Sequence, residues 1–114
     1  MPPVSQCAKP IYFANRQSKR AFEALPKKIR EIFSNELESL IAHGLLPLMK
    51  HAFLPGKTVE LKVNGSPAYR CVYKVLNNVV VVLHSFVKTC EGPDRKNLKT
   101  LEQRLKMLNS SEFC

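Results

Sequence analysis

The sequence predicts one α+β domain: a twisted antiparallel sheet with two N-terminal helices packed on one face and a C-terminal helix. The chain has 114 residues, which is the length of a single domain with a modest core. Its apolar residues follow the period of a helix up to about residue 43 and a period of two from residue 58. Helices followed by a three-strand meander favour a sheet covered on one face, in the order β-α-α-β-β-β-α.

The first half of the chain is expected to hold a short strand and two helices. The apolar run over 11–14 predicts the strand. A basic helix follows over 15–24, and Pro26 separates it from a long helix over 26–43, because proline is tolerated only in the first turn of a helix. Gly44 is well placed to end this helix. The apolar stripe of the long helix, in which we expect Ile32 and Phe33 to be core, consists of Ile29, Ile32, Phe33, Leu37, Leu40 and Ile41.

The second half is expected to hold the meander. The segment over 45–57 contains Pro47, Pro55 and Gly56 and is interpreted as a linker. Beyond it, alternation of apolar and polar residues indicates half-buried strands, and Asn77-Asn78 is typical of a hairpin turn because Asn tolerates positive φ. The strands are expected at 58–63, 68–76 and 79–87.

A last amphipathic helix is predicted over 94–108, because leucines recur on one stripe at Leu98, Leu101, Leu105 and Leu108. The domain should therefore span 10–108. The unpatterned residues 1–9 are interpreted as a flexible lead-in, and residues 109–114 as a tail.

The charge of the chain points to its partners. Eighteen Lys and Arg oppose nine Asp and Glu, for a net charge of +9. Such a surplus on a small domain favours a polyanionic partner, although it can also serve solubility alone. Asp94 is the only aspartate, which argues against a catalytic Asp pair and against an Asp-rich calcium loop.

Other classes of protein lack support. The four cysteines, at 7, 71, 90 and 114, form no Cys-x-x-Cys pair, so we expect no metal and no cofactor. Neither a phosphate-binding P-loop nor a Gly-x-Ser-x-Gly motif is present. With no apolar leader and no run long enough to span a bilayer, we expect a cytoplasmic protein with free thiols, Cys71 filling core space.

Cations recur on the predicted strands. If Val59, Leu61 and Val63 face the helices, Lys62 faces the opposite side of the sheet. Strand pairing could bring Arg70, His84 and Lys88 to the same surface. The alternative is a solvated sheet face with incidental charges.

The strand motifs resemble one known family. Their most specific parts are Glu60-Leu61-Lys62, Tyr69-Arg70 with Tyr73, and Leu83-His84 with Phe86 and Lys88, followed by a helix containing Arg. In order and spacing they are similar to the phage Gp49-like branch of the RelE/HigB superfamily of type II toxins, over about residues 10–108. The resemblance implies a RelE-like fold and a ribosome-dependent mRNA endonuclease (an mRNA interferase) that cuts through the RNA 2′-hydroxyl without a metal.

The resemblance also implies partners and site residues. The expected partners are a cognate antitoxin, typically a helix-turn-helix protein, together with mRNA in the ribosomal A site and rRNA; no membrane is expected. Arg70 is expected to stabilise transition-state charge with support from Lys62 and Lys88. His84 is the first candidate for proton transfer, with Glu60 or a lysine as alternatives. A packed, structural His84 is the alternative. Further RNA contacts are assigned to Lys50, Lys57, Lys74 and Tyr73.

The sequence departs from the family pattern at two places. Lys62 stands where the family usually has Arg, and the segment 88–93 lacks one of two usual lysines and contains Glu91. Both changes allow for a weakened activity. Two alternatives therefore stay open: a non-catalytic RNA- or DNA-binding module with the same fold, and a protein-interaction domain for an acidic partner.

Overall fold

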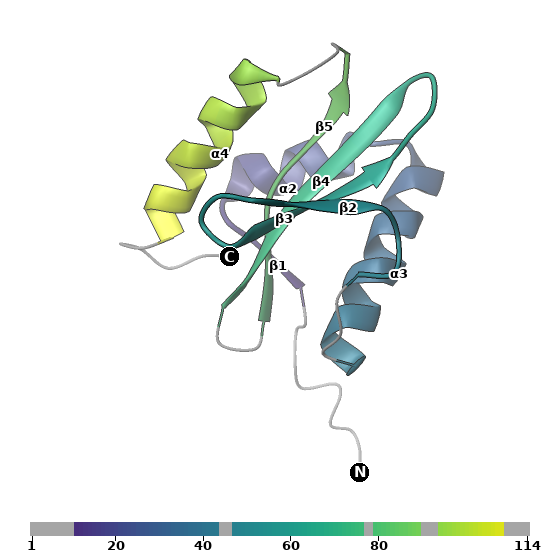
Figure 1. The fold of residues 1–114 in the computed structure, drawn as a ribbon, viewed down its shortest axis with the longest axis horizontal. Coiled ribbons are helices and arrows are strands. Elements are labelled where there is room, and N and C mark those ends of the chain that lie inside the picture. The colour runs from purple at the N-terminus through teal and green to yellow at the C-terminus, as the bar shows by residue number, and fades with distance from the viewer. Residues whose placement is uncertain (1–10, 44–46, 77–78, 90–93, 109–114) are drawn as a thin grey trace.

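A five-stranded sheet in the order β1-β5-β4-β3-β2 forms the centre of the protein (Figure 1). The computed structural model describes residues 11–43, 47–76, 79–89 and 94–108. Along the chain the elements are β1 (Ile11–Phe13), α2 (Arg16–Glu23), α3 (Lys27–His43), β2 (His51–Leu54), β3 (Thr58–Val63), β4 (Ala68–Leu76), β5 (Val79–Lys88) and α4 (Arg95–Leu108). The α+β fold class and the expected order of helices and meander are confirmed.

The sheet is mixed rather than wholly antiparallel. Strands β2 to β5 pair antiparallel in succession, whereas β1 pairs parallel to β5, with Tyr12 opposite Val81. Parallel neighbours need a long connection, and between β1 and β5 the chain forms both N-terminal helices and three other strands. The prediction that the strand near residue 11 extends the sheet is confirmed, and only its direction differs from the expected pattern.

The prediction of a linker over 45–57 is wrong for four residues. His51–Leu54 forms β2, which pairs antiparallel with β3 so that Phe53 lies opposite Val59. The turn between these strands places Gly56 and Lys57 at φ of 81° and 60°. A short edge strand buries little surface, so its own residues carry a weak signal and pairing with β3 decides its conformation.

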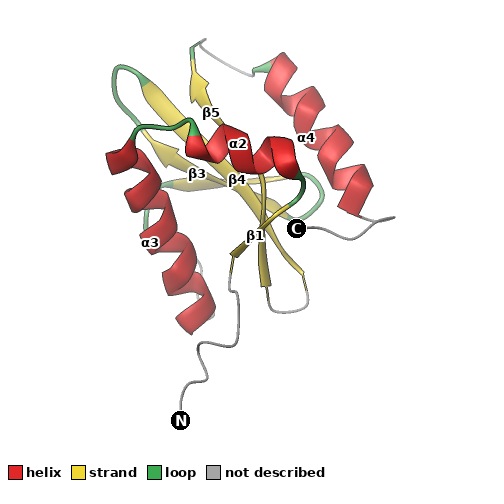
Figure 2. Ribbon diagram, turned by 180° about the vertical axis from the view of Figure 1, so that it is seen from behind, coloured by secondary structure: helices red, strands yellow, loops and turns green. Residues whose placement is uncertain are grey.

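Helices cover both faces of the sheet. Figure 2 shows α2 and α3 in front of one face, where Phe33 and Leu37 pack with Leu61, Cys71 and Val82. Helix α4 packs against the opposite face, where Leu101 meets Val72, Val81 and Leu83. The two N-terminal helices therefore share one face, as predicted. The other face, beside α4, is the one onto which Lys62 and Arg70 project.

The predicted core of the long helix is half right. Phe33 is 0% exposed, whereas Ile32 is 38% exposed. Leu37 and Leu40 are buried together with Phe33 and define the centre of the stripe, from which Ile32 is displaced around the helix. Cys71 is buried as a free thiol, and burial raises its pKa to about 12, so it fills core space as expected.

Some expectations concern residues outside the described ones. These are the lead-in over 1–9, the helix end at Gly44, the turn at Asn77-Asn78, the family departure at Glu91 and the tail over 109–114.

Candidate functional site

The strand register gathers the predicted cations on one face. Lys62 of β3 lies directly opposite Arg70 of β4, and Arg70 lies directly opposite Phe86 of β5. Lys88 lies two residue pairs further along, opposite Ala68. Side chains alternate between the faces of a sheet, so these residues project toward the α4 side. The expected juxtaposition of Lys62, Arg70 and Lys88 is confirmed as geometry.

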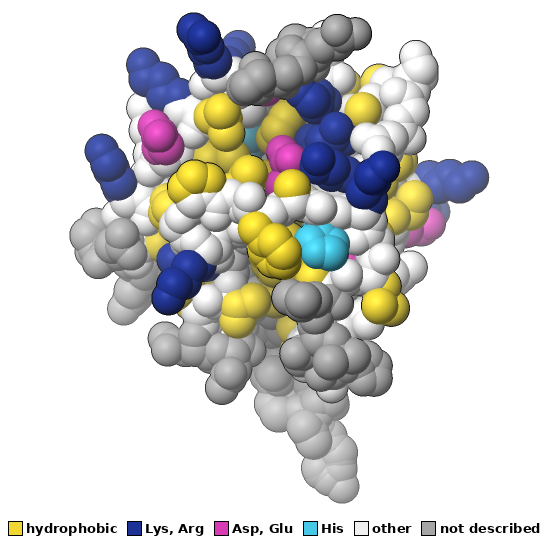
Figure 3. Space-filling view, in the orientation of Figure 1, with side chains coloured by type: hydrophobic (Ala, Val, Ile, Leu, Met, Phe, Trp, Pro, Cys, Tyr) yellow, Lys and Arg dark blue, Asp and Glu magenta, His cyan; other side chains and the backbone are white. Residues whose placement is uncertain are grey.

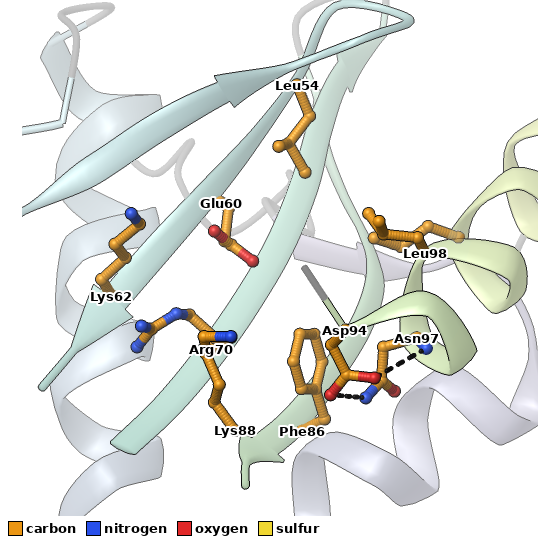
Figure 4. Close-up of a pocket in the computed structure, with 10 residues that line it drawn as sticks. Leu54, Glu60, Lys62, Arg70, Phe86, Lys88, Asp94, Asn97 and Leu98 are labelled. Atoms are coloured by element: carbon orange, nitrogen blue, oxygen red, sulfur yellow. Dashed lines mark hydrogen bonds between the residues drawn. The ribbon is translucent and has the colours of Figure 1, made fainter. Parts of the chain in front are cut away.

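These side chains line a pocket of about 260 Å³ between the sheet and the start of α4. Figure 4 shows Glu60, Lys62 and Arg70 together on neighbouring strands, with Asp94 and Asn97 across from them. In the space-filling view, dark blue side chains gather around acidic ones on this face (Figure 3). The complete lining is Leu54, Glu60, Lys62, Arg70, Phe86, Lys88, Asp94, Asn97, Leu98 and Leu101.

Arg70 is the most enclosed of the cations. Its side chain lies on the central strand β4, where it is only 7% exposed, and its Nη1 donates to the carbonyl oxygen of Tyr69 at 3.0 Å. A guanidinium stays protonated at any physiological pH and offers five donors in a planar fork. Held in this way beside Lys62 and Lys88, it suits a phosphate, which can accept two parallel hydrogen bonds from it.

His84 lies behind this pocket with both ring nitrogens occupied. Nη1 of Arg104 donates to Nδ1 of His84 at 2.9 Å, and Nε2 of His84 pairs with Oδ1 of Asn97 at 2.5 Å. Because a guanidinium can only donate, Nδ1 must be the acceptor and Nε2 carries the proton. The amide of Asn97 in turn donates through Nδ2 to Oδ2 of Asp94 at 2.8 Å. A chain of hydrogen bonds thus runs from the guanidinium of Arg104 through His84 and Asn97 to the carboxylate of Asp94.

The surroundings of His84 keep it neutral. Burial lowers the pKa of His84, the neighbouring Arg104 adds to that effect, and the hydrogen bond to Asn97 opposes it. The histidine is not among the residues that line the pocket. Both ring nitrogens are occupied, which favours the structural alternative for His84 over a proton-transfer role.

Asp94 organises the start of α4. Its carbonyl oxygen accepts from the backbone N–H of Leu98 at 3.0 Å, and its carboxylate accepts from Asn97 through both backbone and side chain. These are the bonds of a helix N-cap. The hydrogen bonds from Asn97 also lower the pKa of Asp94, so its carboxylate is ionised at neutral pH.

Comparison with known proteins shows the family to which this chain belongs. The family model described as "Phage derived protein Gp49-like (DUF891)" matches residues 20–106, which is most of the chain and includes the whole pocket. The chain belongs to the Gp49-like family. The expected resemblance to the phage Gp49-like branch is thereby confirmed.

A solved structure supports the fold of this Gp49-like protein. A free-state structure of the E. coli toxin RelE, in a form with two arginines changed to alanine, superposes with a TM-score of 0.58 at 18% identity. The match covers 84% of this chain and 93% of the RelE chain. At that identity the likeness concerns the fold, and the RelE-like fold class is confirmed. No curated protein matches the sequence.

The remaining sequence-predicted contacts of the Gp49-like protein do not line the pocket. Lys50 and Lys57 are exposed near the two ends of β2, and the Nζ of Lys74 donates to the carbonyl oxygen of Gly56 at 2.9 Å. Tyr73 is wrong as an RNA contact. It is only 2% exposed and packs in the core on the opposite face of the sheet, so its ring cannot reach a base.

Three residues that hold the candidate site of the Gp49-like protein together escaped the sequence analysis. Asn97 and Arg104 hold His84, and Asp94 was noted only as the single aspartate. The sequence did contain a sign of Arg104, because the family pattern includes an arginine on the last helix. That arginine was not matched to a particular residue. The sequence contained no such sign of Asn97, since an asparagine on a helix becomes informative only once its neighbours in space are known.

Two further observations concern metal ions and membranes. The part of the chain that the structure describes contains no group of three or more His, Cys, Asp or Glu side chains placed to hold a metal ion. None of the described helices is long and apolar enough to cross a membrane.

Proposed function

We propose that this Gp49-like protein is the toxin of a type II toxin-antitoxin system and acts as a ribosome-dependent mRNA endonuclease in the cytoplasm. The observation that carries the proposal is the convergence of Arg70, Lys62 and Lys88 in one pocket beside the carboxylate of Glu60. The family membership of the chain supports the same conclusion.

The pocket suits phosphoryl transfer without a metal ion. In this reaction the 2′-oxygen attacks the adjacent phosphorus, the bond to the 5′-oxygen breaks, and a 2′,3′-cyclic phosphate and a 5′-hydroxyl form. Negative charge grows on the non-bridging oxygens in the transition state. Arg70 would bind these oxygens with two parallel hydrogen bonds, and Lys62 and Lys88 would add positive charge.

Glu60 is our candidate for the proton acceptor. The attacking 2′-hydroxyl must lose its proton, and a carboxylate within the pocket can take it. The pocket holds two carboxylates, and that of Asp94 already accepts the hydrogen bonds that begin α4. His84 has no open nitrogen. Lys88, which also lines the pocket, would protonate the leaving 5′-oxygen.

The proposed partners divide between the two faces of the molecule. We propose that mRNA in the ribosomal A site meets the pocket. The basic residues of the helical half, which include the exposed Arg16, Lys19, Arg20, Lys27 and Lys28, would contact rRNA or an acidic segment of the antitoxin. We propose a small helix-turn-helix protein encoded beside this one as the antitoxin.

The test is induction in cells, followed by cleavage of mRNA on purified ribosomes. We expect growth arrest that the neighbouring gene product reverses, and cleavage that falls about 100- to 1,000-fold in Arg70→Ala. Lys106→Ala is the matched control, because it removes one exposed positive charge outside the pocket and should cleave normally. Cleavage by folded Arg70→Ala at the wild-type rate would contradict the assignment.

The same experiment separates the main alternative, a nucleic-acid-binding module without catalysis. The lysine at position 62 favours that alternative, because it keeps the charge of the family's usual arginine but loses the planar fork. A module of this kind would bind RNA in a salt-dependent way yet leave the mRNA intact on ribosomes.

A further inference from the structure

We propose that the exposed face of Phe86 is a stacking platform for one RNA base, set beside the cations that bind the neighbouring phosphate. The proposal deepens the proposed function, on which it rests for the identity of the ligand as RNA. Nothing in the strand motifs assigns a role to this ring.

The position of Phe86 within the pocket is the first argument. Its side chain is half-buried and lines the pocket, and its strand partner directly opposite is Arg70. Side chains of directly opposite residues lie about 4.5–5.5 Å apart at Cβ, so the Phe86 and Arg70 side chains leave the sheet from adjacent positions. In Figure 4 the Phe86 ring stands between the strand cations and the start of α4. A nucleotide whose phosphate meets Arg70 therefore has its base near the ring.

The second argument is that the ring is held in place from behind. The Phe86 ring stacks on the ring of His84, with centroids 5.2 Å apart and an interplanar angle of 26°. His84 itself is fixed by Arg104 on one nitrogen and Asn97 on the other. A platform whose orientation is set before binding loses little side-chain entropy when a base arrives.

The third argument is the division of the pocket by chemistry. The cations Lys62, Arg70 and Lys88 come from the strands. The side next to α4 is lined by the apolar Phe86, Leu98 and Leu101, together with Asp94 and Asn97, whose side chains are hydrogen-bonded to each other. A phosphate matches the first part and the flat apolar face of a base matches the second. Grooves that bind single strands combine these two features, since stacking tolerates any base.

The structure thus assigns two distinct roles to neighbouring aromatic residues. Phe86 would contact the base, whereas His84 would act through Phe86 as a positioning residue. The exposed Phe53 provides a contrast on the other side of the sheet. It is 64% exposed on the edge strand β2 and does not line the pocket.

Binding of two probes of equal charge tests the platform without any need for cleavage. One probe is a short 2′-O-methyl RNA oligomer, which cannot be cut, and the other is an abasic oligomer of the same length. Affinities are measured at low salt by fluorescence anisotropy for the wild type, Phe86→Leu, Phe86→Trp and Phe53→Leu. A circular dichroism melt of each variant confirms that it is folded.

We expect the wild type to bind the base-containing oligomer more tightly than the abasic one. Phe86→Leu should lose about tenfold in affinity for the former and nothing for the latter, within the roughly 5- to 150-fold range that one stacked base contributes. Phe86→Trp, which keeps an aromatic face, and the control Phe53→Leu should retain the preference for bases.

The outcomes distinguish this proposal from the proposed function. Equal losses for both oligomers in Phe86→Leu, or no preference for bases in the wild type, would overturn the platform even if ribosomal cleavage is observed. Conversely, a preference for bases that depends on Phe86 in a protein that cuts no mRNA would support the platform and reject the endonuclease.

Discussion

The guanidinium of Arg104 donates to Nδ1 of His84 at 2.9 Å, and the same Nη1 donates to the carbonyl oxygen of Leu83 at 2.9 Å. One buried side chain of α4 therefore holds two consecutive residues of β5. This contact sets the tautomer of His84 and joins α4 to the sheet directly behind the pocket. The geometry of the pocket depends on it, because α4 supplies Asn97 and Leu98 to the wall that faces the strands.

We expect His84 and Arg104 to be energetically coupled. Removing Arg104 leaves Nδ1 of His84 half-buried without its donor, and a lost partner of this kind costs about 1–3 kcal/mol. A double-mutant cycle of Arg104→Met and His84→Phe, measured by urea unfolding, should show the second change costing less once the first is made. Strictly additive losses would mean that the hydrogen bond contributes nothing to stability.

Acid should destabilise the protein through His84. Burial lowers the pKa of His84 in the folded state below the 6.5 of an ordinary histidine, so the unfolded chain binds the proton more readily. The contribution to stability is complete above about pH 6.5 and is lost as the pH falls below that value. Protonation would also place a proton on Nδ1, against the donor of Arg104. The free energy of unfolding, measured in urea, should therefore fall less between about pH 7.5 and pH 5 for His84→Gln than for the wild type.

Glu60→Gln tests the proton acceptor separately from RNA binding. The amide keeps the size of the carboxylate but cannot take a proton, so we expect cleavage on ribosomes to slow by about 100- to 10,000-fold. Affinity for an uncleavable RNA should stay the same or increase, because a negative charge is removed from the pocket. If Glu60→Gln cleaves normally, one of the pocket lysines becomes the candidate acceptor.

Phe33 and its neighbour Ile32 provide a matched pair for the core of the long helix. Phe33 is 0% exposed and Ile32 is 38% exposed on the same turn of α3. Phe33→Ala should lower the free energy of unfolding by roughly 3–5 kcal/mol because it leaves a cavity. Ile32→Ala should cost less than about 1.5 kcal/mol, since part of its surface is already in water. Equal losses in denaturant melts would contradict the orientation of this helix.

Gly56→Ala should destabilise the turn between β2 and β3 for two reasons. Gly56 has φ of 81°, which is unfavourable for a residue with a Cβ, and an added Cβ would clash with the Cδ2 of Leu105. We expect a loss of about 1 kcal/mol or more in thermal or urea unfolding. The loss should be smaller when the substitution is made in Leu105→Ala, which removes the clash and leaves only the backbone cost.

Local patterns in the sequence determined most of the helices and strands. They also determined which strand side chains lie on the sheet face away from the N-terminal helices. The alternation of β3 and β4 was enough to place Lys62 and Arg70 opposite the helix-covered side, because side chains of a strand alternate regardless of its partners. The same alternation put Tyr73 with Cys71 on the covered side, so its burial could have been read from the chain. Phe33 was found from the periodicity of its helix.

Tertiary structure decided what depends on residues far apart along the chain. β2 exists as a strand because β3 lies beside it, and β1 takes its direction from β5. The surroundings of His84 and Phe86 likewise depend on α4, which brings Arg104 and Asn97 to the imidazole and forms the wall of the pocket that Phe86 lines. A sequence specifies the period of each element locally, but register and docking arise from the burial and hydrogen bonding of all elements together, so they appear only when the chain is folded.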